Sequence, residues 1–117
     1  MLAKINRMRR PDEFRSAVRG RRAASRTLVV HAATVGRDTV GRDAPARVGV
    51  VVSRAVGNSV VRHRVQRRLR AAIRPLLPRL GSDLVVLRAL PAAATADFAA
   101  LRADLDCCVT SVERRRP

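Results

Sequence analysis

Residues 52–74 read VSRAVGNSVVRHRVQRRLRAAIR, and the rest of the chain is organised around them. The valine-rich start predicts a strand that ends at Ser53, and Gly57 with Asn58 predicts a tight connection. Asn58 or Ser59 can then cap a helix, because either side-chain oxygen can accept a hydrogen bond from an unpaired backbone N–H of the first turn. The stretch therefore predicts a strand, a short turn and a helix in succession.

The predicted helix has one apolar side. At about 100° per residue its apolar residues fall in one stripe, made of Val61, Val65, Leu69, Ala72, Ile73 and Leu76. The opposite side carries His63, Arg64, Arg67, Arg70 and Arg74, with Arg62 and Arg68 on its two flanks. We call this basic set of residues the basic ridge. One side of the helix is thus expected to pack on the core, and the other to present the ridge.

The basic ridge has no acidic neighbours in the sequence. No Asp or Glu occurs between Ala44 and Ser82, although a solvated helix face normally mixes signs for i,i+4 pairing. Like charges at that spacing cost roughly a few tenths of a kcal/mol each in an isolated helix, and a bound polyanion would neutralise them. The pattern therefore favours polyanion binding. The alternative is that the ridge is only the solvated face of the helix.

Length and composition indicate one strongly basic domain. The 117 residues are 47% hydrophobic, and 25 Lys and Arg residues against 9 Asp and Glu give a net charge of 25 − 9 = +16. We expect a single domain over residues 1–117, with a basic arm (1–10) that is mobile until nucleic acid binds, a folded core (about 11–113) and a frayed tail (114–117). Arginine suits bidentate contacts with phosphate, so nucleic acid is the expected partner, and an anionic membrane surface is a weaker alternative.

The expected location is the cytoplasm. No apolar run approaches the roughly 20 residues that span a bilayer, and residues 1–10 lack the apolar stretch of a signal peptide. The two cysteines, Cys107 and Cys108, are adjacent and have no further ligands at zinc spacing, so reduced structural thiols are expected.

The chain predicts an α+β fold in the order α-β-β-β-α-β-α, a single-domain sandwich with helices packed on a mixed four-stranded sheet. The predicted elements are a helix from Pro11 to Arg19, strands at 21–25, 27–35 and 47–53, the basic helix, a strand at 83–89, and a last helix capped near Thr95. The strand at 47–53 is apolar on both faces and is expected to be central. In the last helix the expected apolar stripe is Phe98, Leu101, Leu105, Cys108 and Val112.

The residues from Ser53 to Arg70 resemble the signature of the bacterial ribonuclease P protein subunit, a pattern close to S-x-K-x-G-N-A-V-x-R-N-R-x-K-R-x-x-R. In register with it are Gly57, Asn58, Val60, Arg62, Arg64, Arg67 and Arg70. Arg54 is a basic residue next to the position of the first Lys of the pattern, which is Ala55 here, and the further departures are Ser59 for Ala, His63 for Asn and Gln66 for Lys. The segment from Asn6 to Phe14 also resembles the family, which opens with a basic arm and a helix that carries this Phe. The resemblance covers residues 4–113 and implies a left-handed crossover around the basic helix, where the residues alone favour a right-handed one.

The resemblance implies a function in transfer RNA maturation. In that family the RNA subunit is the catalyst, and its bound Mg²⁺ ions generate and orient the hydroxide that hydrolyses one phosphodiester of precursor transfer RNA, leaving the mature 5′ end. The protein binds the catalytic RNA and holds the 5′ leader in a cleft between helix and sheet. The implied partners are therefore the catalytic RNA and precursor transfer RNA, with no obligate protein partner, no membrane, and no metal or cofactor bound by the protein alone.

The resemblance also carries over particular residues. The implied RNA-binding residues are Arg54, Asn58, Arg62, His63, Arg64, Arg67, Arg68 and Arg70. The basic arm contributes Arg7, Arg9 and Arg10, and the leader groove corresponds to Phe14, Val18 and His31. Of these groove residues, only Phe14 keeps the aromatic ring that the family uses for stacking. We therefore expect a hydrophobic groove with little leader-sequence preference.

No protein-borne active site is expected. A metal-dependent nuclease needs clustered carboxylates, but the nine acidic residues are scattered along the chain. A metal-independent ribonuclease needs a general acid and a general base, and the only two histidines, His31 and His63, belong to different elements. The competing class is a structural RNA- or DNA-binding protein of the ribosomal-protein kind, with no part in cleavage, because both classes share the charge. The Gly-Asn turn that leads into Arg62-His63-Arg64 favours the ribonuclease P subunit, since compaction of nucleic acid does not require it.

Overall fold

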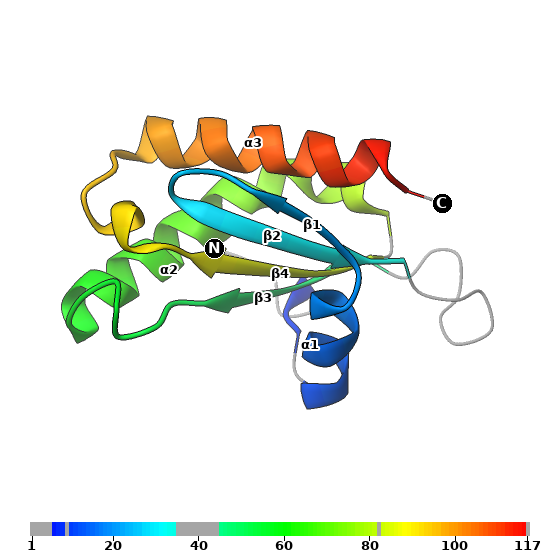
Figure 1. Cartoon of the computed structure of the whole chain (residues 1–117), viewed down its shortest axis with the longest axis horizontal. Helices are drawn as coiled ribbons and strands as arrows, with labels where there is room; N and C mark the ends of the chain where they lie inside the picture. The colour runs from blue at the N-terminus through cyan, green and yellow to red at the C-terminus, as the bar shows by residue number, and fades with distance from the viewer. Residues whose placement is uncertain (1–5, 9, 35–44, 82, 117) are drawn as a thin grey trace.

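The elements occur in the predicted order in a computed structural model that describes residues 6–8, 10–34, 45–81 and 83–116 (Figure 1). They are α1 (Pro11–Val18), β1 (Arg21–Ala24), β2 (Leu28–Ala33), β3 (Arg47–Val51), α2 (Ser59–Ile73), the 3₁₀ helix η2 (Arg74–Leu80), β4 (Leu84–Ala89), the 3₁₀ helix η3 (Pro91–Ala94) and α3 (Phe98–Arg114). The α+β class and the mixed four-stranded sheet are thereby confirmed.

Helices cover both faces of the sheet (Figure 1). α2 and α3 pack on one face, where the large core joins side chains of all four strands with those of both helices. α1 packs on the other face, over β2 and β4. The smaller cluster on that face consists of Met8, Ala17 and Val86, flanked by Phe14 and Leu84. Most of the buried apolar side chains therefore lie between the sheet and the α2–α3 layer.

The sheet order is β1-β2-β4-β3, with β3 parallel to β4 and the other neighbours antiparallel. The prediction that the strand at 47–53 is central is therefore wrong, because β2 and β4 are the inner strands and β3 lies at the edge. A strand is apolar on both faces wherever helices cover both faces of its sheet, whatever its place in the order. The free side of β3 is met by the basic arm, since the Met8 N–H donates to the Val48 carbonyl at 2.9 Å.

Part of the basic arm is thus folded, where a mobile segment is predicted. Arg7 forms a parallel bridge with Val48, and the Asn6 side-chain amide donates to the Ala46 carbonyl at 2.9 Å. The prediction is corrected for residues 6–8, and the rest of the arm up to residue 5, with Arg9, lies outside the described residues.

The end of α3 is also fastened to the sheet. A frayed tail is expected from residue 114, but the helix continues through Arg114. Beyond it the Arg115 guanidinium donates to the Arg22 carbonyl on the edge strand β1, and Arg116 Nη2 lies 2.9 Å from Asp83 Oδ2. These bonds hold the last helix against β1 and against the start of β4.

A side-chain cap starts α2. Asn58 Oδ1 accepts a hydrogen bond from the Val61 backbone N–H at 3.0 Å, so Asn58 and not Ser59 is the cap. β3 ends at Val51 rather than at the predicted Ser53, and the residues between β3 and α2 form the connection. Because β3 and β4 are parallel, α2 and η2 make the crossover between them. The left-handed turn of this crossover, which the resemblance implies, stays a prediction.

The last helix begins later than predicted. In place of Thr95, the cap is Asp97, whose Oδ1 accepts a hydrogen bond from the Ala100 N–H at 2.7 Å. Four members of the predicted apolar stripe are buried, namely Leu101, Leu105, Cys108 and Val112. Phe98, however, is the first residue of the helix and keeps 37% of its surface exposed.

Candidate nucleic-acid interface

The side chains of α2 divide into a buried and a solvent-facing side. Of the predicted apolar stripe, the buried members are Val65, Leu69, Ala72 and Ile73, and the half-buried members are Val61 and Leu76. Three members of the basic ridge, His63, Arg67 and Arg74, are exposed. The helix cannot roll without exposing its apolar side, so the core fixes the direction in which the ridge points.

Two arginines of the ridge also donate hydrogen bonds to backbone carbonyls within the protein. Arg64 Nη2 donates to the Ala94 carbonyl at 3.3 Å, and Arg68 Nη1 donates to the Ala96 carbonyl at 3.2 Å. These bonds tie α2 to the end of η3 and to the segment that follows it before α3. A guanidinium has five N–H donors in a planar fork, so each side chain retains donors for a phosphate. Arg64 is therefore a flank residue like Arg68, and it does not lie at the centre of the ridge.

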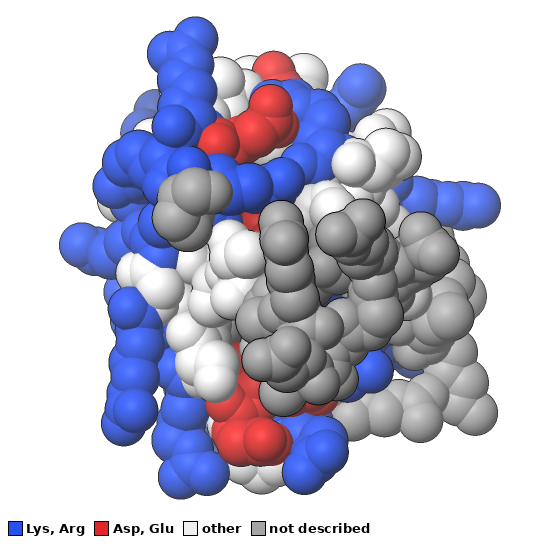
Figure 2. Space-filling view, turned by 90° about the vertical axis from the view of Figure 1, so that its right-hand side faces the viewer, with Lys and Arg blue, Asp and Glu red and all other residues white. Residues whose placement is uncertain are grey.

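Within the described residues, no carboxylate pairs with the basic ridge. The ion pairs lie elsewhere: Asp12 with Arg10, Glu13 with Arg47, Asp83 with Arg21 and Arg116, and Asp106 and Glu113 with Arg79. On the face that Figure 2 shows, acidic side chains gather mainly toward the top and the bottom of the view, among a majority of basic ones. The ridge keeps its positive charge unpaired at the surface, which is the electrostatic condition for polyanion binding.

Two of the three groove residues share the α1 face of the sheet. His31 is the cross-strand partner of Val86, and Val86 is in turn the partner of Gly49. The ring of half-buried Phe14 lies directly over Gly49, where an added Cβ would come within 2.4 Å of Phe14 Cζ. A glycine at this position therefore lets the Phe14 ring approach the sheet. Val18, by contrast, is 52% exposed at the end of α1.

Two arginines flank His31 on the same face, and sequence reasoning missed both. Arg22 is its cross-strand partner on β1. Arg88 lies two residues after Val86 on β4, and its side chain is therefore on the same face of the sheet. Burial lowers the pKa of His31, and the positive charges of Arg88 and Arg22 lower it further, so the imidazole is neutral near pH 7. Strand alternation was the available signal, because Arg88 interrupts the apolar run of β4 on the face that His31 shares.

The remaining predicted contact residues lie at the surface. Arg54 is exposed in the connection before α2, and Asn58 is exposed while its Oδ1 serves as the helix cap. Arg7 and Arg10 of the basic arm are exposed too, with Arg10 Nε 3.4 Å from Asp12 Oδ1. These positions are accessible to RNA, and their role in binding stays a prediction.

The two cysteines lie next to each other on α3. Cys107 is exposed and Cys108 is buried, both as free thiols, and burial raises the pKa of Cys108. Across the described ranges, no group of three or more His, Cys, Asp or Glu side chains is placed to hold a metal ion. None of the described helices is both long and apolar enough to cross a membrane.

Comparison with known proteins matches this arrangement to one family. The model of the Ribonuclease P family aligns with residues 2–113. The chain belongs to the ribonuclease P protein family. The resemblance seen in residues 53–70 is confirmed by this match over almost the whole chain.

Members of the ribonuclease P protein family are similar in both sequence and structure. The ribonuclease P protein component of a Nocardioides species is 50% identical over 114 residues, covering 96% of this chain and 95% of its own. The Staphylococcus aureus RNase P protein has the same fold, with a TM-score of 0.77 at 19% identity, covering 92% of this chain and 95% of that one. A structure of a Staphylococcus aureus RNase P protein mutant, described as defective in mRNA degradation activity, gives the same TM-score of 0.77 at 21% identity over 92% of this chain and 88% of its own.

Proposed function

We propose that this chain is the protein subunit of a ribonuclease P holoenzyme that works in the cytoplasm. It binds the catalytic RNA through the basic ridge, and it binds the 5′ leader of precursor transfer RNA on the α1 side of the sheet. The holoenzyme removes that leader by Mg²⁺-dependent hydrolysis and leaves the mature 5′ end. The proposal is carried by the ridge itself. Four of its arginines stand in register with the family signature, and none of its arginines has a carboxylate partner among the described residues.

In this proposal the ridge acts through electrostatics. Each arginine that contacts a phosphate releases condensed counterions and reduces the repulsion between two RNA molecules that must come together. The reacting groups, and the Mg²⁺ ions that serve them, belong to the RNA subunit. Two features of the described residues support this division: they offer no carboxylate cluster, and His31 and His63 lie on opposite sides of the sheet.

Reconstitution tests this division of labour. RNA-free protein, incubated with precursor transfer RNA and Mg²⁺, is expected to leave the precursor intact, and added catalytic RNA is expected to restore cleavage at the mature 5′ end. Messenger RNA belongs in the same assay, because a mutant of a similar Staphylococcus aureus protein is described as defective in mRNA degradation activity. Cleavage of either RNA by the protein alone contradicts the proposal, and binding of the catalytic RNA with no effect on cleavage identifies a structural RNA-binding protein.

Phe14→Ala is expected to separate leader binding from the rest of substrate binding. Stacking of a base on an aromatic ring contributes about 1–3 kcal/mol, so the holoenzyme should bind leader-bearing precursor roughly 5-fold to 150-fold more weakly. Mature transfer RNA has no leader, and its affinity should not change. Both affinities are measured by titration of labelled RNA with the reconstituted holoenzyme.

The control for Phe14→Ala is Phe14→Leu. Phe14 packs against the small cluster of Met8, Ala17 and Val86, so its removal also affects packing. Leucine restores most of the apolar contact but offers no ring, and it should therefore leave leader binding weak while recovering the stability of the fold. Equal losses for precursor and mature transfer RNA would show that Phe14 is a core residue only and that the leader lies elsewhere.

A further inference from the structure

Phe98 is an aromatic residue at the surface of a chain that has few aromatics. The sequence contains two Phe and no Trp or Tyr. Phe14 is half-buried against Gly49. Phe98, in contrast, is the first residue of α3 and keeps 37% of its surface exposed. An exposed aromatic ring offers a flat face on which a nucleobase can stack.

The ring of Phe98 is paired with a cation. The Arg102 guanidinium carbon lies 5.7 Å from the centre of the ring, within the range of a cation–π interaction. Arg102 is one helical turn further along α3 and is itself exposed. A ring and a guanidinium side by side present two flat surfaces, and nucleobases stack on both kinds of surface.

The surroundings of Phe98 are basic because the flank of the basic ridge reaches this corner. Arg64 and Arg68 donate to the carbonyls of Ala94 and Ala96, in the segment that leads directly into α3. The nearest carboxylate in sequence, Asp97, is engaged at the helix start, where its oxygen accepts a hydrogen bond from a backbone N–H. The corner between α2, η3 and α3 therefore combines an exposed ring with several arginines, which complements RNA and not an apolar protein surface.

We propose that Phe98 and Arg102 form a stacking platform for an unpaired nucleotide of the catalytic RNA, as an extension of the basic ridge. The inference rests on the proposed function. The catalytic RNA is the source of the nucleotide, because Phe98 belongs to the α2–α3 layer, whereas the leader residues Phe14 and His31 lie on the α1 face of the sheet. A leader nucleotide that stacks on Phe14 therefore cannot also stack on Phe98.

Phe98→Leu and Phe98→Tyr test the platform. Leucine keeps apolar volume at this position but cannot stack, so affinity for the catalytic RNA should fall about 5-fold or more. Tyrosine keeps the ring and should retain wild-type affinity. The slope of log affinity against log salt should not change in either variant, because no phosphate contact is removed. Thermal unfolding of both variants verifies that they fold like the wild type.

A photo-cross-link identifies the RNA that Phe98 meets. A Phe98→p-benzoylphenylalanine variant in the assembled holoenzyme, with precursor transfer RNA bound, is expected to cross-link to the catalytic RNA. Cross-linking to the precursor alone, or wild-type affinity of a folded Phe98→Leu variant, overturns the inference. If such variants still support precursor cleavage, the proposed function stands without the platform. If the wild-type protein itself does not support cleavage, the proposed function is wrong, whatever the Phe98 variants show.

Discussion

Replacing Arg62, Arg67 and Arg70 with alanine is expected to weaken binding of the catalytic RNA by about 100-fold to 500-fold at roughly 0.1 M salt. Each phosphate contact contributes about 0.7 to 0.9 to the slope of log affinity against log salt. Loss of three contacts should therefore flatten the slope by about 2.1 to 2.7. These three side chains form no ion pair with any described carboxylate, so the folded structure loses little when they are removed.

The triple variant keeps Arg64 and Arg68, the two arginines of the ridge that donate hydrogen bonds to backbone carbonyls of the protein itself. Arg64 and Arg68 hold the segment before α3, and their removal would mix loss of RNA contacts with loss of structure. The matched control replaces Arg15, Arg26 and Arg114 with alanine, since these are exposed arginines outside the ridge and their removal lowers the net charge equally. If the control loses as much affinity as the ridge variant, net charge alone binds the RNA. If the ridge variant keeps wild-type affinity and slope, the ridge is only a solvated face.

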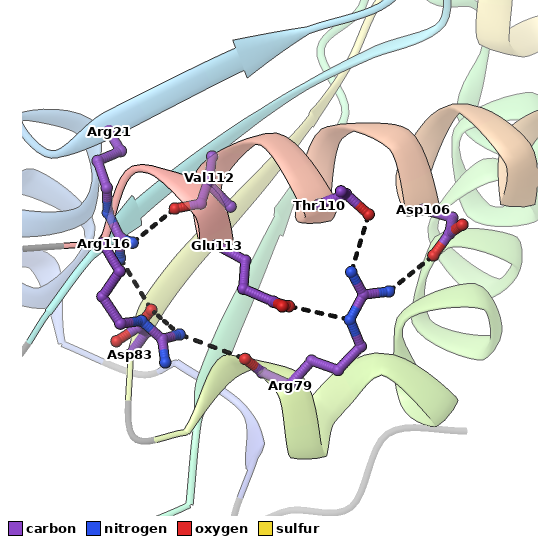
Figure 3. Close-up of polar contacts among 8 residues, drawn as sticks. All are labelled: Arg21, Arg79, Asp83, Asp106, Thr110, Val112, Glu113 and Arg116. Atoms are coloured by element: carbon purple, nitrogen blue, oxygen red, sulfur yellow. Dashed lines mark hydrogen bonds and ion pairs between the residues drawn. The ribbon is translucent and has the colours of Figure 1, made fainter.

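Asp83→Ala is expected to lower the free energy of unfolding by about 3 kcal/mol, as for other buried ion pairs that lose one partner. Asp83 is only 3% exposed, and its Oδ2 accepts hydrogen bonds from Arg21 and Arg116, each at 2.9 Å (Figure 3). The Arg21 side chain is itself only 12% exposed and donates a further hydrogen bond to the Val112 carbonyl at 2.7 Å. Removal of the carboxylate leaves this guanidinium buried without its counter-charge. Equilibrium denaturation by urea measures the loss.

Two further variants separate the contribution of the buried Asp83–Arg21 pair to stability from that of the more exposed Asp83–Arg116 pair. Arg116→Ala removes an arginine whose side chain is 33% exposed, and it should cost about 1 kcal/mol or less. Combining Asp83→Ala with Arg21→Met removes both charges and should recover part of the lost stability. A loss below about 1 kcal/mol for Asp83→Ala alone would show that the cluster in Figure 3 contributes little to folding.

Local patterns in the sequence predict the elements and the basic ridge. The period of apolar residues in α2 is the period of the helix, so the buried side of α2 follows directly from the positions of Val65 and Leu69. The cap is equally local, because Asn58 bonds an N–H three residues along the chain. Arg67 is exposed for the same reason that Leu69 is buried: both positions are set by the helical repeat.

Contacts between distant residues could not be predicted in this way. The place of β3 at the edge depends on which strands pair with it, and the pattern of its own apolar residues does not indicate those partners. The cluster around Asp83 joins Arg21 and Arg116 from opposite ends of the chain. The exposure of Phe98 depends on where η3 places the start of α3, which periodicity within the helix does not determine.

Reconstitution across a Mg²⁺ titration tests the central claim most directly. Cleavage of precursor transfer RNA by the catalytic RNA is measured with and without the wild-type protein, at fixed monovalent salt. The account predicts that the protein lowers the Mg²⁺ concentration needed for half-maximal cleavage, and that the variant lacking Arg62, Arg67 and Arg70 does not. The same Mg²⁺ dependence with and without the wild-type protein would contradict it.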